Sequence, residues 1–437
     1  MKTLFPLILL LIPFQQFILA QDQNPSQQKV MNGFPPSRES QVTFANYREH
    51  PFSQWSFRNA GAPMHVLMMP RSGPVHVFKE SHDAGIAKSI YVDTEGNSKT
   101  FESMFSDNYA DGVIVLKNNA VLYERYWNGL SRDYQHVWFS CSKSMASTAF
   151  GILVEQKKVD LSASPAQYIP ELKGSAFERA TIQDVLNMST ALGYQENYVD
   201  TASFYYKEYG SAANTRYVPG GAEPDPKTTE VLGVYDFLVK KAYINKELKP
   251  GVKFEYSSAN VDVISWMISR LSGMPYHDFI RENIWAKMGA EHDAYITVDR
   301  AYTSVATGGI NSTLRDAALF GQLILNRGSI DGKQIIPQSW VDEPLKLTTT
   351  DKERYARNDV YVKAKMPWIG YKNYWWILDE VKGEYAALGI HGQVIYINRS
   401  ANMVIAYFSS QPQASSVAGF KNFVSKLNAC RELAKKS

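Results

Sequence analysis

The strongest constraint on the fold is an eighteen-residue run from Val137 to Val154, VWFSCSKSMASTAFGILV, in which Lys143 is the only charged residue. A run this apolar predicts a buried helix. Ser140 and Lys143 are three residues apart, so they share one face of that helix. Because keeping a buried lysine charged is costly, we expect Lys143 to lose its proton readily and to act as a base beside the Ser140 hydroxyl. This pair predicts the chemistry of Ser–Lys acyl transfer.

The Ser-x-x-Lys spacing is a weak signal by itself, and it occurs twice. The first copy, Ser26 and Lys29, lies in the polar tail 21–29, where we expect no core around it, so we discard it. For the second copy a structural alternative stays open. Ser140 could cap a buried helix while Lys143 extends its ammonium to solvent.

The N-terminus resembles a secretion signal. Residues 1–20 contain one basic residue, Lys2, then an apolar core and a small residue, Ala20, before the polar chain begins. This pattern predicts a signal peptide cleaved near Ala20 and a secreted or periplasmic protein. The apolar core is too short, and too interrupted by Pro13, for a stable membrane anchor.

Composition narrows the classes of partner. The formal net charge is +3 and there is no run of Lys and Arg, so we predict no nucleic-acid partner. Of the two cysteines, Cys141 lies in the apolar run and is expected to be a core thiol rather than half of a disulfide. No Cys/His cluster has zinc spacing and no glycine-rich phosphate loop follows a strand, so neither metal nor cofactor is predicted. The oligomeric state stays open.

Strand patterns occur towards both ends of the chain, with helical patterns between them. A hairpin is expected at 112–127 with its turn at Asn118-Asn119, and strands at 374–377, 393–397 and 403–408. We therefore predict an α+β fold, an antiparallel sheet flanked by N- and C-terminal helices with an inserted, mostly helical lobe. The expected divisions are a signal peptide at 1–20, an extended lead-in at 21–60, a sheet lobe from 61–139 and 300–437, and a helical lobe at 140–299 that holds the Ser140 helix.

The ordered motifs resemble the serine β-lactamase-like, penicillin-recognising superfamily, in its class C and esterase branch and close to 6-aminohexanoate-dimer hydrolase-like proteins. The resemblance covers about residues 105–435. Its landmarks follow one another along the chain: Tyr123-Glu124-Arg125-Tyr126, Ser140-Cys141-Ser142-Lys143, Pro250-Gly251, Phe254-Glu255-Tyr256-Ser257, Gly308-Gly309-Ile310, Arg315-Asp316, Tyr374-Trp375-Trp376 and Gly389-Ile390-His391-Gly392. Each landmark is weak alone, but the ordered set is specific. The resemblance implies a β-lactamase/transpeptidase-like fold.

The resemblance also implies a role for each candidate residue. Ser140 would be the nucleophile, Lys143 its general base, and Tyr256 the group that passes a proton to the leaving group. Backbone N–H groups of Ser140 and Ile390 would form the oxyanion hole. The substrate-binding candidates are His391, for which holding the strand edge is an equal alternative, and Tyr194 and Asp200, which belong to an expected long aromatic loop at 189–206.

Two departures from the family pattern limit the expected substrate. Tyr256-Ser257-Ser258 lacks the Asn of the Tyr-x-Asn element, and His391 replaces the lysine of Lys-Thr-Gly. Both elements hold polar groups of β-lactams, so the sequence favours hydrolysis of small esters or linear amides. A β-lactamase or a D-stereospecific peptidase on the same fold stays an alternative, as does a binding or sensory protein that has lost turnover.

Overall fold

The computed structural model describes residues 30–215, 229–414 and 416–436, so the predicted signal peptide, residues 1–20, lies outside the described residues. The chain forms two units, Met1–Gln41 and Val42–Ser437. In the first, the described residues include one short 3₁₀ turn, η2 (Arg38–Ser40). The sheets and helices of the fold lie in the second unit. None of the helices in the described part of the chain is long and apolar enough to cross a membrane.

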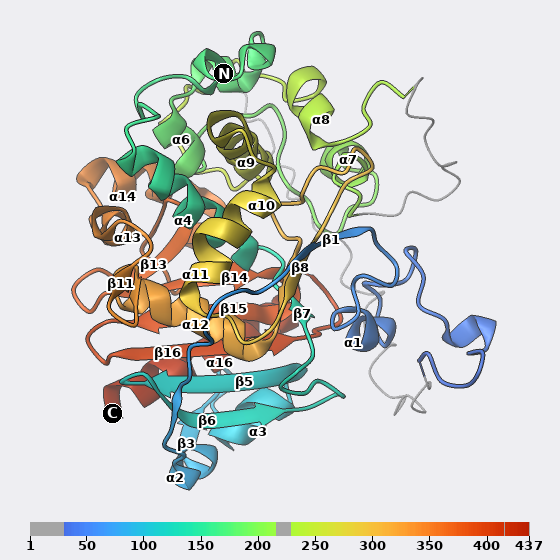
Figure 1. The fold of residues 1–437 in the computed structure, drawn as a ribbon, viewed down its shortest axis with the longest axis vertical. Coiled ribbons are helices and arrows are strands. Elements are labelled where there is room, and N and C mark those ends of the chain that lie inside the picture. Colours follow the sequence, from blue (N-terminus) through green and yellow to red (C-terminus); the bar gives the residue numbers. More distant parts are fainter. Residues whose placement is uncertain (1–29, 216–228, 415, 437) are drawn as a thin grey trace, which may run out of the picture. The chain divides into compact units, whose positions relative to one another are not determined.

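The main sheet has eight strands in the order β12-β13-β14-β15-β16-β5-β6-β2 (Figure 1). Its members are β2 (Lys79–Glu80), β5 (Ala110–Lys117), β6 (Ala120–Tyr126), β12 (Gly370–Lys372), β13 (Trp375–Asp379), β14 (Glu384–Gly389), β15 (Gln393–Asn398) and β16 (Met403–Ser409). All neighbours are antiparallel except β2 and β6 at one edge, which run parallel. Because β5 pairs with β16, both ends of the chain build one sheet, and the predicted α+β class is confirmed.

The predicted hairpin is the β5–β6 pair. Its turn residues Asn118 and Asn119 have φ angles of 51° and 60°. Two successive residues with positive φ form the tight turn whose twist matches that of the strands, and asparagine tolerates this conformation better than most residues.

Both faces of the central strands are covered by helices. On β16, Val404 packs against α12 (Leu314–Leu325), where a Cβ added at Gly321 would lie 2.6 Å from Val404 Cγ1. Tyr407, three residues along and therefore on the opposite face, packs against Phe105 of α3 (Phe101–Ser106) with ring centroids 5.1 Å apart. The Lys426 ammonium of α16 (Val417–Lys436) lies over the same Tyr407 ring. Burial on two faces explains why these strands are apolar almost throughout.

Helices from the middle of the chain gather beside the sheet, where Figure 1 draws them in green to yellow. The two longest, α4 (Cys141–Glu155) and α9 (Ala259–Ser272), pack against each other. Thr181 and Asp184 form a capping box at the start of α6 (Ile182–Leu186), and α9 ends at Gly273, whose φ is 73°. The other helices are α1 (Phe52–Ser56), α2 (Ala84–Lys88), α5 (Ala176–Arg179), α6 (Ile182–Leu186), α7 (Gly210–Ala212), α8 (Val234–Lys240), α10 (Tyr276–Ile280), α11 (Ala286–Met288), α13 (Gln338–Asp342), α14 (Thr349–Ala356) and α15 (Asp359–Lys363).

A second sheet was not predicted. It has the order β1-β8-β9-β7 and joins segments far apart in the sequence, β1 (Val66–Met69), β7 (His136–Val137), β8 (Ala294–Thr297) and β9 (Ile310–Ser312). Two-stranded pairs are formed by β3 (Ile90–Val92) with β4 (Ser98–Thr100) and by β10 (Ser329–Ile330) with β11 (Lys333–Gln334). Since β7 ends three residues before Ser140, this sheet fixes the chain that enters the nucleophile helix.

The predicted extended lead-in at 21–60 is wrong for its last part. Residues Phe52–Ser56 form α1, and the Phe57 carbonyl accepts a hydrogen bond of 2.8 Å from Val137 N. The Phe57 ring is buried against Phe139 and His391, with centroids 4.9 Å from each. The lead-in therefore contributes the Phe57 ring to the packing next to the start of the Ser140 helix.

Candidate active site

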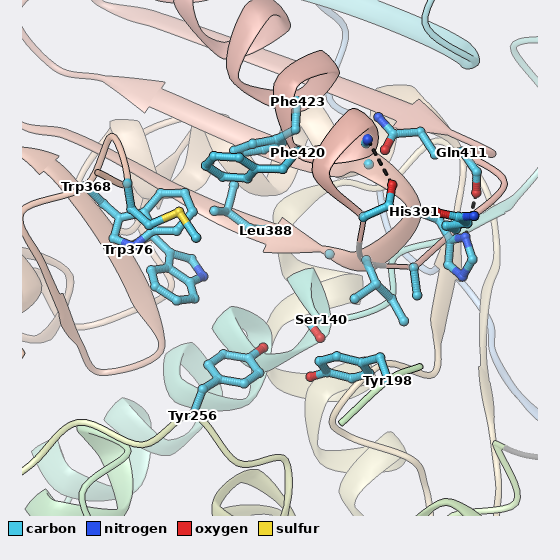
Figure 2. A pocket seen from close by; sticks show the side chains of 18 of the residues that line it. Ser140, Tyr198, Tyr256, Trp368, Trp376, Leu388, His391, Gln411, Phe420 and Phe423 are labelled. Atoms are coloured by element: carbon cyan, nitrogen blue, oxygen red, sulfur yellow. Dashed lines mark hydrogen bonds between the residues drawn. The ribbon is translucent and has the colours of Figure 1, made fainter. Parts of the chain in front are cut away.

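Ser140 occupies the N-cap position of α4, at the positive end of the helix dipole. The residue before it, Phe139, has a φ of 43°, a conformation that is uncommon for a non-glycine residue. This sharp turn links β7 to α4 and places Ser140 at the wall of a cavity (Figure 2). A positive helix end stabilises negative charge that develops on an attacked carbonyl oxygen.

Lys143 contacts Ser140 as the spacing predicts. Lys143 Nζ lies 3.1 Å from Ser140 Oγ and donates a second hydrogen bond of 2.8 Å to the Thr307 carbonyl oxygen. The lysine is 2% exposed, so the alternative in which its ammonium reaches solvent is wrong. The buried helix thus holds an amine beside the serine hydroxyl.

Burial changes the protonation of this amine. It lowers the pKa of Lys143 from 10.5 to about 8, while the carboxylates of Glu196 and Asp262 oppose the fall. A lysine with this pKa exists partly as the free amine at neutral pH, which is the form that can accept a proton.

Tyr256 lies just before α9 and completes a group of three. Lys143 Nζ is 5.2 Å from the centroid of its ring, and its hydroxyl points into the same cavity as Ser140 (Figure 2). Burial and the Glu196 carboxylate raise the pKa of Tyr256 well above 10, and a hydrogen bond with Ser140 opposes this rise. Tyr256 is therefore a neutral phenol at physiological pH, able to donate a proton or hydrogen bond but unsuited to act as the resting base.

The cavity has a volume of about 210 Å³, and its lining residues come from segments between Ser140 and Phe423. Ser140, Tyr256, Ile390 and His391 all contribute to its wall. Ile390 begins a short 3₁₀ turn, η8 (Ile390–Gly392), which connects β14 to β15. The structure thus brings together Ser140, Lys143, Tyr256 and Ile390, the residues predicted to act as nucleophile, base, proton donor and second oxyanion donor.

His391 lies in this wall but is held by the protein. Its Nδ1 is 2.7 Å from the Gln411 carbonyl oxygen, and its ring packs against Phe57 and Phe139. Burial lowers the pKa of His391 to about 3, so the ring is neutral at physiological pH. This geometry favours the alternative that His391 secures the strand edge, and a neutral ring offers no cation for a substrate carboxylate.

The two candidates from the aromatic loop do not line the Ser140 cavity. Asp200 is exposed, and its carboxylate accepts a hydrogen bond of 2.8 Å from Ala202 N within its own turn. The ring of Tyr194 packs against Phe204 and Phe237, and its hydroxyl is 3.5 Å from Ser257 Oγ. Neither side chain is placed to contact a substrate at Ser140 directly, as the prediction required. Asp200 is engaged in a local turn hydrogen bond, and Tyr194 is packed among aromatic rings.

One other residue of that loop lines the Ser140 cavity, and a second supports it by a hydrogen bond. Tyr198 lines the cavity, and its ring lies beside Ser140 (Figure 2). Behind it, the Glu196 carboxylate accepts hydrogen bonds from the Tyr198 hydroxyl and from Ser258 N. Sequence reasoning missed both residues, since nothing in a polar and aromatic loop distinguishes one acid or tyrosine from the next.

A second missed carboxyl lies in the buried wall near Lys143. Asp262 on α9 is fully buried and accepts a hydrogen bond of 2.7 Å from Tyr209. Tyr209 Oη is also 3.5 Å from Thr307 Oγ1, and the Thr307 carbonyl holds Lys143. Burial raises the pKa of Asp262 to about 7. Its signal was present in the sequence: Asp262 is the one acid in an apolar helical run, the same pattern that drew attention to Lys143.

Cys141, next to the nucleophile, is buried and unbridged, and burial raises the pKa of its thiol. Across residues 30–215, 229–414 and 416–436, no three His, Cys, Asp or Glu side chains are grouped in a way that could hold a metal ion.

Comparisons with known proteins agree with this geometry. The profile of the Beta-lactamase family matches residues 103–423. A 6-aminohexanoate-dimer hydrolase from Paenarthrobacter ureafaciens is 29% identical over 380 residues, which cover 87% of this chain and 91% of that protein.

Solved structures show the same fold. One from Bacillus anthracis, described as a 6-aminohexanoate-dimer hydrolase, superimposes with a TM-score of 0.77 at 25% identity, covering 92% of this chain and 98% of that one. The D-amino acid amidase from Ochrobactrum anthropi SV3 shares the fold at 13% identity, with a TM-score of 0.53 and coverage of 76% and 100%. The chain therefore belongs to the beta-lactamase family and is a serine hydrolase.

Proposed function

We propose that the chain is an exported enzyme that hydrolyses small esters or linear amides through an acyl-enzyme on Ser140. The observation that carries the proposal is the 3.1 Å contact between Lys143 Nζ and Ser140 Oγ at the wall of a cavity. A hydroxyl beside an amine of lowered pKa is an activated nucleophile.

In the acylation step, Ser140 Oγ attacks the substrate carbonyl carbon while Lys143 Nζ takes the hydroxyl proton. The carbonyl oxygen becomes an oxyanion, which the N–H groups of Ser140 and Ile390 stabilise. When the intermediate collapses, the bond to the leaving group breaks. Tyr256 donates its proton to the departing oxygen or nitrogen and is reprotonated from the Lys143 ammonium.

In the deacylation step, water replaces the leaving group. Its proton passes through Tyr256 to Lys143, its oxygen attacks the acyl carbon, and the same backbone groups hold the second oxyanion. Expulsion of Ser140 Oγ, which regains its proton from Lys143, releases the acid and restores the resting enzyme.

Replacing Tyr256 by phenylalanine is expected to lower kcat/KM by about 10²–10³-fold, because proton delivery to the leaving group is lost. Steady-state hydrolysis of an amide and of a p-nitrophenyl ester measures the effect, and the amide should suffer more because its leaving group needs the proton. Tyr374→Phe is the matched control. It removes a buried hydroxyl for which the described residues provide no partner, and should change kcat/KM less than threefold. Equal losses in the two variants would contradict a role for the Tyr256 hydroxyl.

The lining of the site supports ester or linear-amide cleavage over β-lactam cleavage. β-Lactamases of this family use a lysine where this chain has His391, and a neutral, packed imidazole cannot replace that cation. A modest nitrocefin rate is consistent with the proposal, but a nitrocefin rate well above the ester rate would support the β-lactamase alternative.

The test uses the intact protein with two reagents. A fluorophosphonate probe should label one site, and peptide mass spectrometry should map it to Ser140, while p-nitrophenyl butyrate should be turned over. A protein that is neither labelled nor active on any short ester or amide would refute the enzyme hypothesis and favour a binding role. Export is tested separately: expression of the full chain in a bacterial host should yield a periplasmic or medium protein whose N-terminus lies near Gln21.

A further inference from the structure

The Ser140 cavity has a distinctive aromatic end. In Figure 2, Trp368, Trp376, Leu388, Phe420 and Phe423 gather on one side, with Ser140 and Tyr256 below them. Three segments from the last part of the chain supply this wall: the chain from α15 to β12, the strands β13 and β14, and the first turns of α16. We define the aromatic compartment by six side chains, Tyr361, Met366, Trp368, Trp376, Phe420 and Phe423.

The aromatic compartment is built as one packed surface. The rings of Trp368 and Trp376 are 4.6 Å apart, and Trp368 also contacts Phe423 at 6.1 Å. Phe420 and Phe423 are three residues apart on α16, so they project from one helix face. Packed aromatic rings that leave a cavity beside them form a site for another apolar group.

This compartment adjoins the reacting groups. The ring of Trp376 stacks on the ring of Tyr256, with centroids 5.7 Å apart and an angle of 20° between the planes. A substrate group in the compartment therefore lies next to the bond that Ser140 attacks.

Lys143 contacts Ser140 at the reacting end of the cavity. Two other charged side chains, Glu196 and Arg48, are engaged elsewhere. None of the described residues that line it carries a charge at neutral pH, since His391 is neutral. Glu196 is occupied by Tyr198 and Ser258, and Arg48 lies over the Phe139 ring with its Nε bonded to Tyr47. A substrate ammonium or carboxylate in the compartment would lose its hydration without gaining an ionic partner.

We infer that the aromatic compartment binds an uncharged apolar or aromatic part of the substrate and discriminates against charged groups there. The inference rests on the proposed function and narrows its substrate class. It also separates this chain from the activity that the relatives' name describes, because a 6-aminohexanoate dimer carries an ammonium and a carboxylate at neutral pH. The whole cavity, of which the aromatic compartment is one end, has a volume of about 210 Å³, larger than the apolar cavity of about 150 Å³ known to bind benzene, so its size admits a phenyl ring.

Matched substrates test the inference. The acyl series consists of p-nitrophenyl esters of acetate, hexanoate, 6-aminohexanoate, adipate (as the monoester) and 4-phenylbutyrate. The second series varies the alcohol, with ethyl, butyl and benzyl acetates followed by acid release. Each buried methylene is worth about fourfold. In the acyl series, we expect kcat/KM for the hexanoate or the phenylbutyrate ester to exceed that for the acetate ester at least tenfold. In the alcohol series, we expect kcat/KM for butyl or benzyl acetate to exceed that for ethyl acetate at least tenfold. A preference in either series supports the inference. The two charged hexanoate analogues should fall at least tenfold below hexanoate.

Variants connect the preference to the compartment. Trp368→Ala and Phe420→Ala should each reduce the ratio of the apolar to the smallest substrate by at least fivefold. Tyr134→Ala, an exposed aromatic outside the cavity, should leave the ratio unchanged. If a compartment variant fails to fold, as judged by circular dichroism, the wild-type substrate series still decides the question.

The outcomes of the two proposals are distinguishable. Turnover of p-nitrophenyl acetate with Ser140 labelled, but no preference for apolar groups in either series, would overturn the aromatic compartment alone. Faster turnover of the 6-aminohexanoate or adipate ester than of the hexanoate ester would also overturn the aromatic compartment alone. It would mean that the site holds an ionic partner for the charged group. No labelling and no turnover of any ester would overturn the proposed function itself.

Discussion

Replacing Ser140 by alanine is expected to lower kcat/KM for p-nitrophenyl butyrate by about 10⁴-fold or more. The change removes the only hydroxyl that contacts Lys143 Nζ among the described residues, so no acyl-enzyme can form. Labelling by a fluorophosphonate should disappear with the activity. The fold should persist, because Ser140 makes no side-chain capping bond to α4.

The matched control is Ser144→Ala, on the same helix. Ser144 is also buried, but its hydroxyl donates to the Tyr374 carbonyl, 2.8 Å away, and does not line the cavity. This variant should lose about 1 kcal/mol of unfolding free energy and keep its activity within threefold. Retention of more than 1% of the activity in Ser140→Ala, with the control unchanged, would mean that another group is the nucleophile.

The parts of the site that the sequence predicted are those set by local rules. Ser140 and Lys143 meet because three residues along a helix bring side chains onto one face, and the absence of other charges in the run indicated burial. The hairpin was predictable for a similar reason, since Asn118 and Asn119 tolerate the φ values that its turn requires.

Tyr256 was a different case. It lies 116 positions beyond Ser140 in the numbering, and nothing in its own neighbourhood indicates a contact with Lys143. Only the ordered resemblance to a family suggested it, and the structure then places its ring 5.2 Å from Lys143 Nζ. A contact between distant segments leaves no periodic signal in a single sequence.

The missed features share this long-range character. The Thr307 carbonyl that holds Lys143 is a backbone atom, so no residue type at that position would reveal it. The polar lead-in gave no sign that Phe57 would pack against Phe139. Within the aromatic loop, the prediction named Asp200, but Glu196 is the acid near Lys143. Choosing Glu196 would have required knowing which side of the loop faces Lys143, and side-chain chemistry alone could not supply that.

Lys143→Met is expected to lower kcat/KM by about 10³–10⁴-fold, because the amine that accepts the Ser140 proton is removed. In the wild-type protein, kcat/KM should rise about tenfold per pH unit at low pH and level off near pH 8, as Lys143 becomes the free amine. Initial rates with a neutral ester between pH 5.5 and 9.5 measure this profile. A flat profile between pH 6 and 8, or a methionine variant with more than a tenth of the activity, would contradict a role for Lys143 as the base.

The same variant should show that this base is kept at a cost in stability. The pKa of Lys143 is about 8 in the folded state and 10.5 for a lysine in an unstructured chain, so the folded protein binds fewer protons than the unfolded chain between these values. Below pH 8 the penalty is fully present and costs about 3 kcal/mol. As the pH rises from 8 to 10.5 it is relieved by about 1.4 kcal/mol per unit.

Lys143→Met should therefore be as stable as the wild type at pH 7 or up to about 3 kcal/mol more stable, with the lost hydrogen bond to Thr307 as the opposing effect. Urea unfolding of both proteins at pH 7, 8 and 9 should show the difference shrinking as the pH rises.

Lys426→Met separates stability from catalysis. Lys426 is also fully buried, its pKa is lowered to about 7 by burial, and it bonds to Asn108 and Ser409, outside the Ser140 cavity. Replacing Lys426 by methionine should change stability in the same direction as Lys143→Met and leave activity unchanged within threefold. A parallel loss of activity in both variants would mean that Lys143 acts through folding and not as a base.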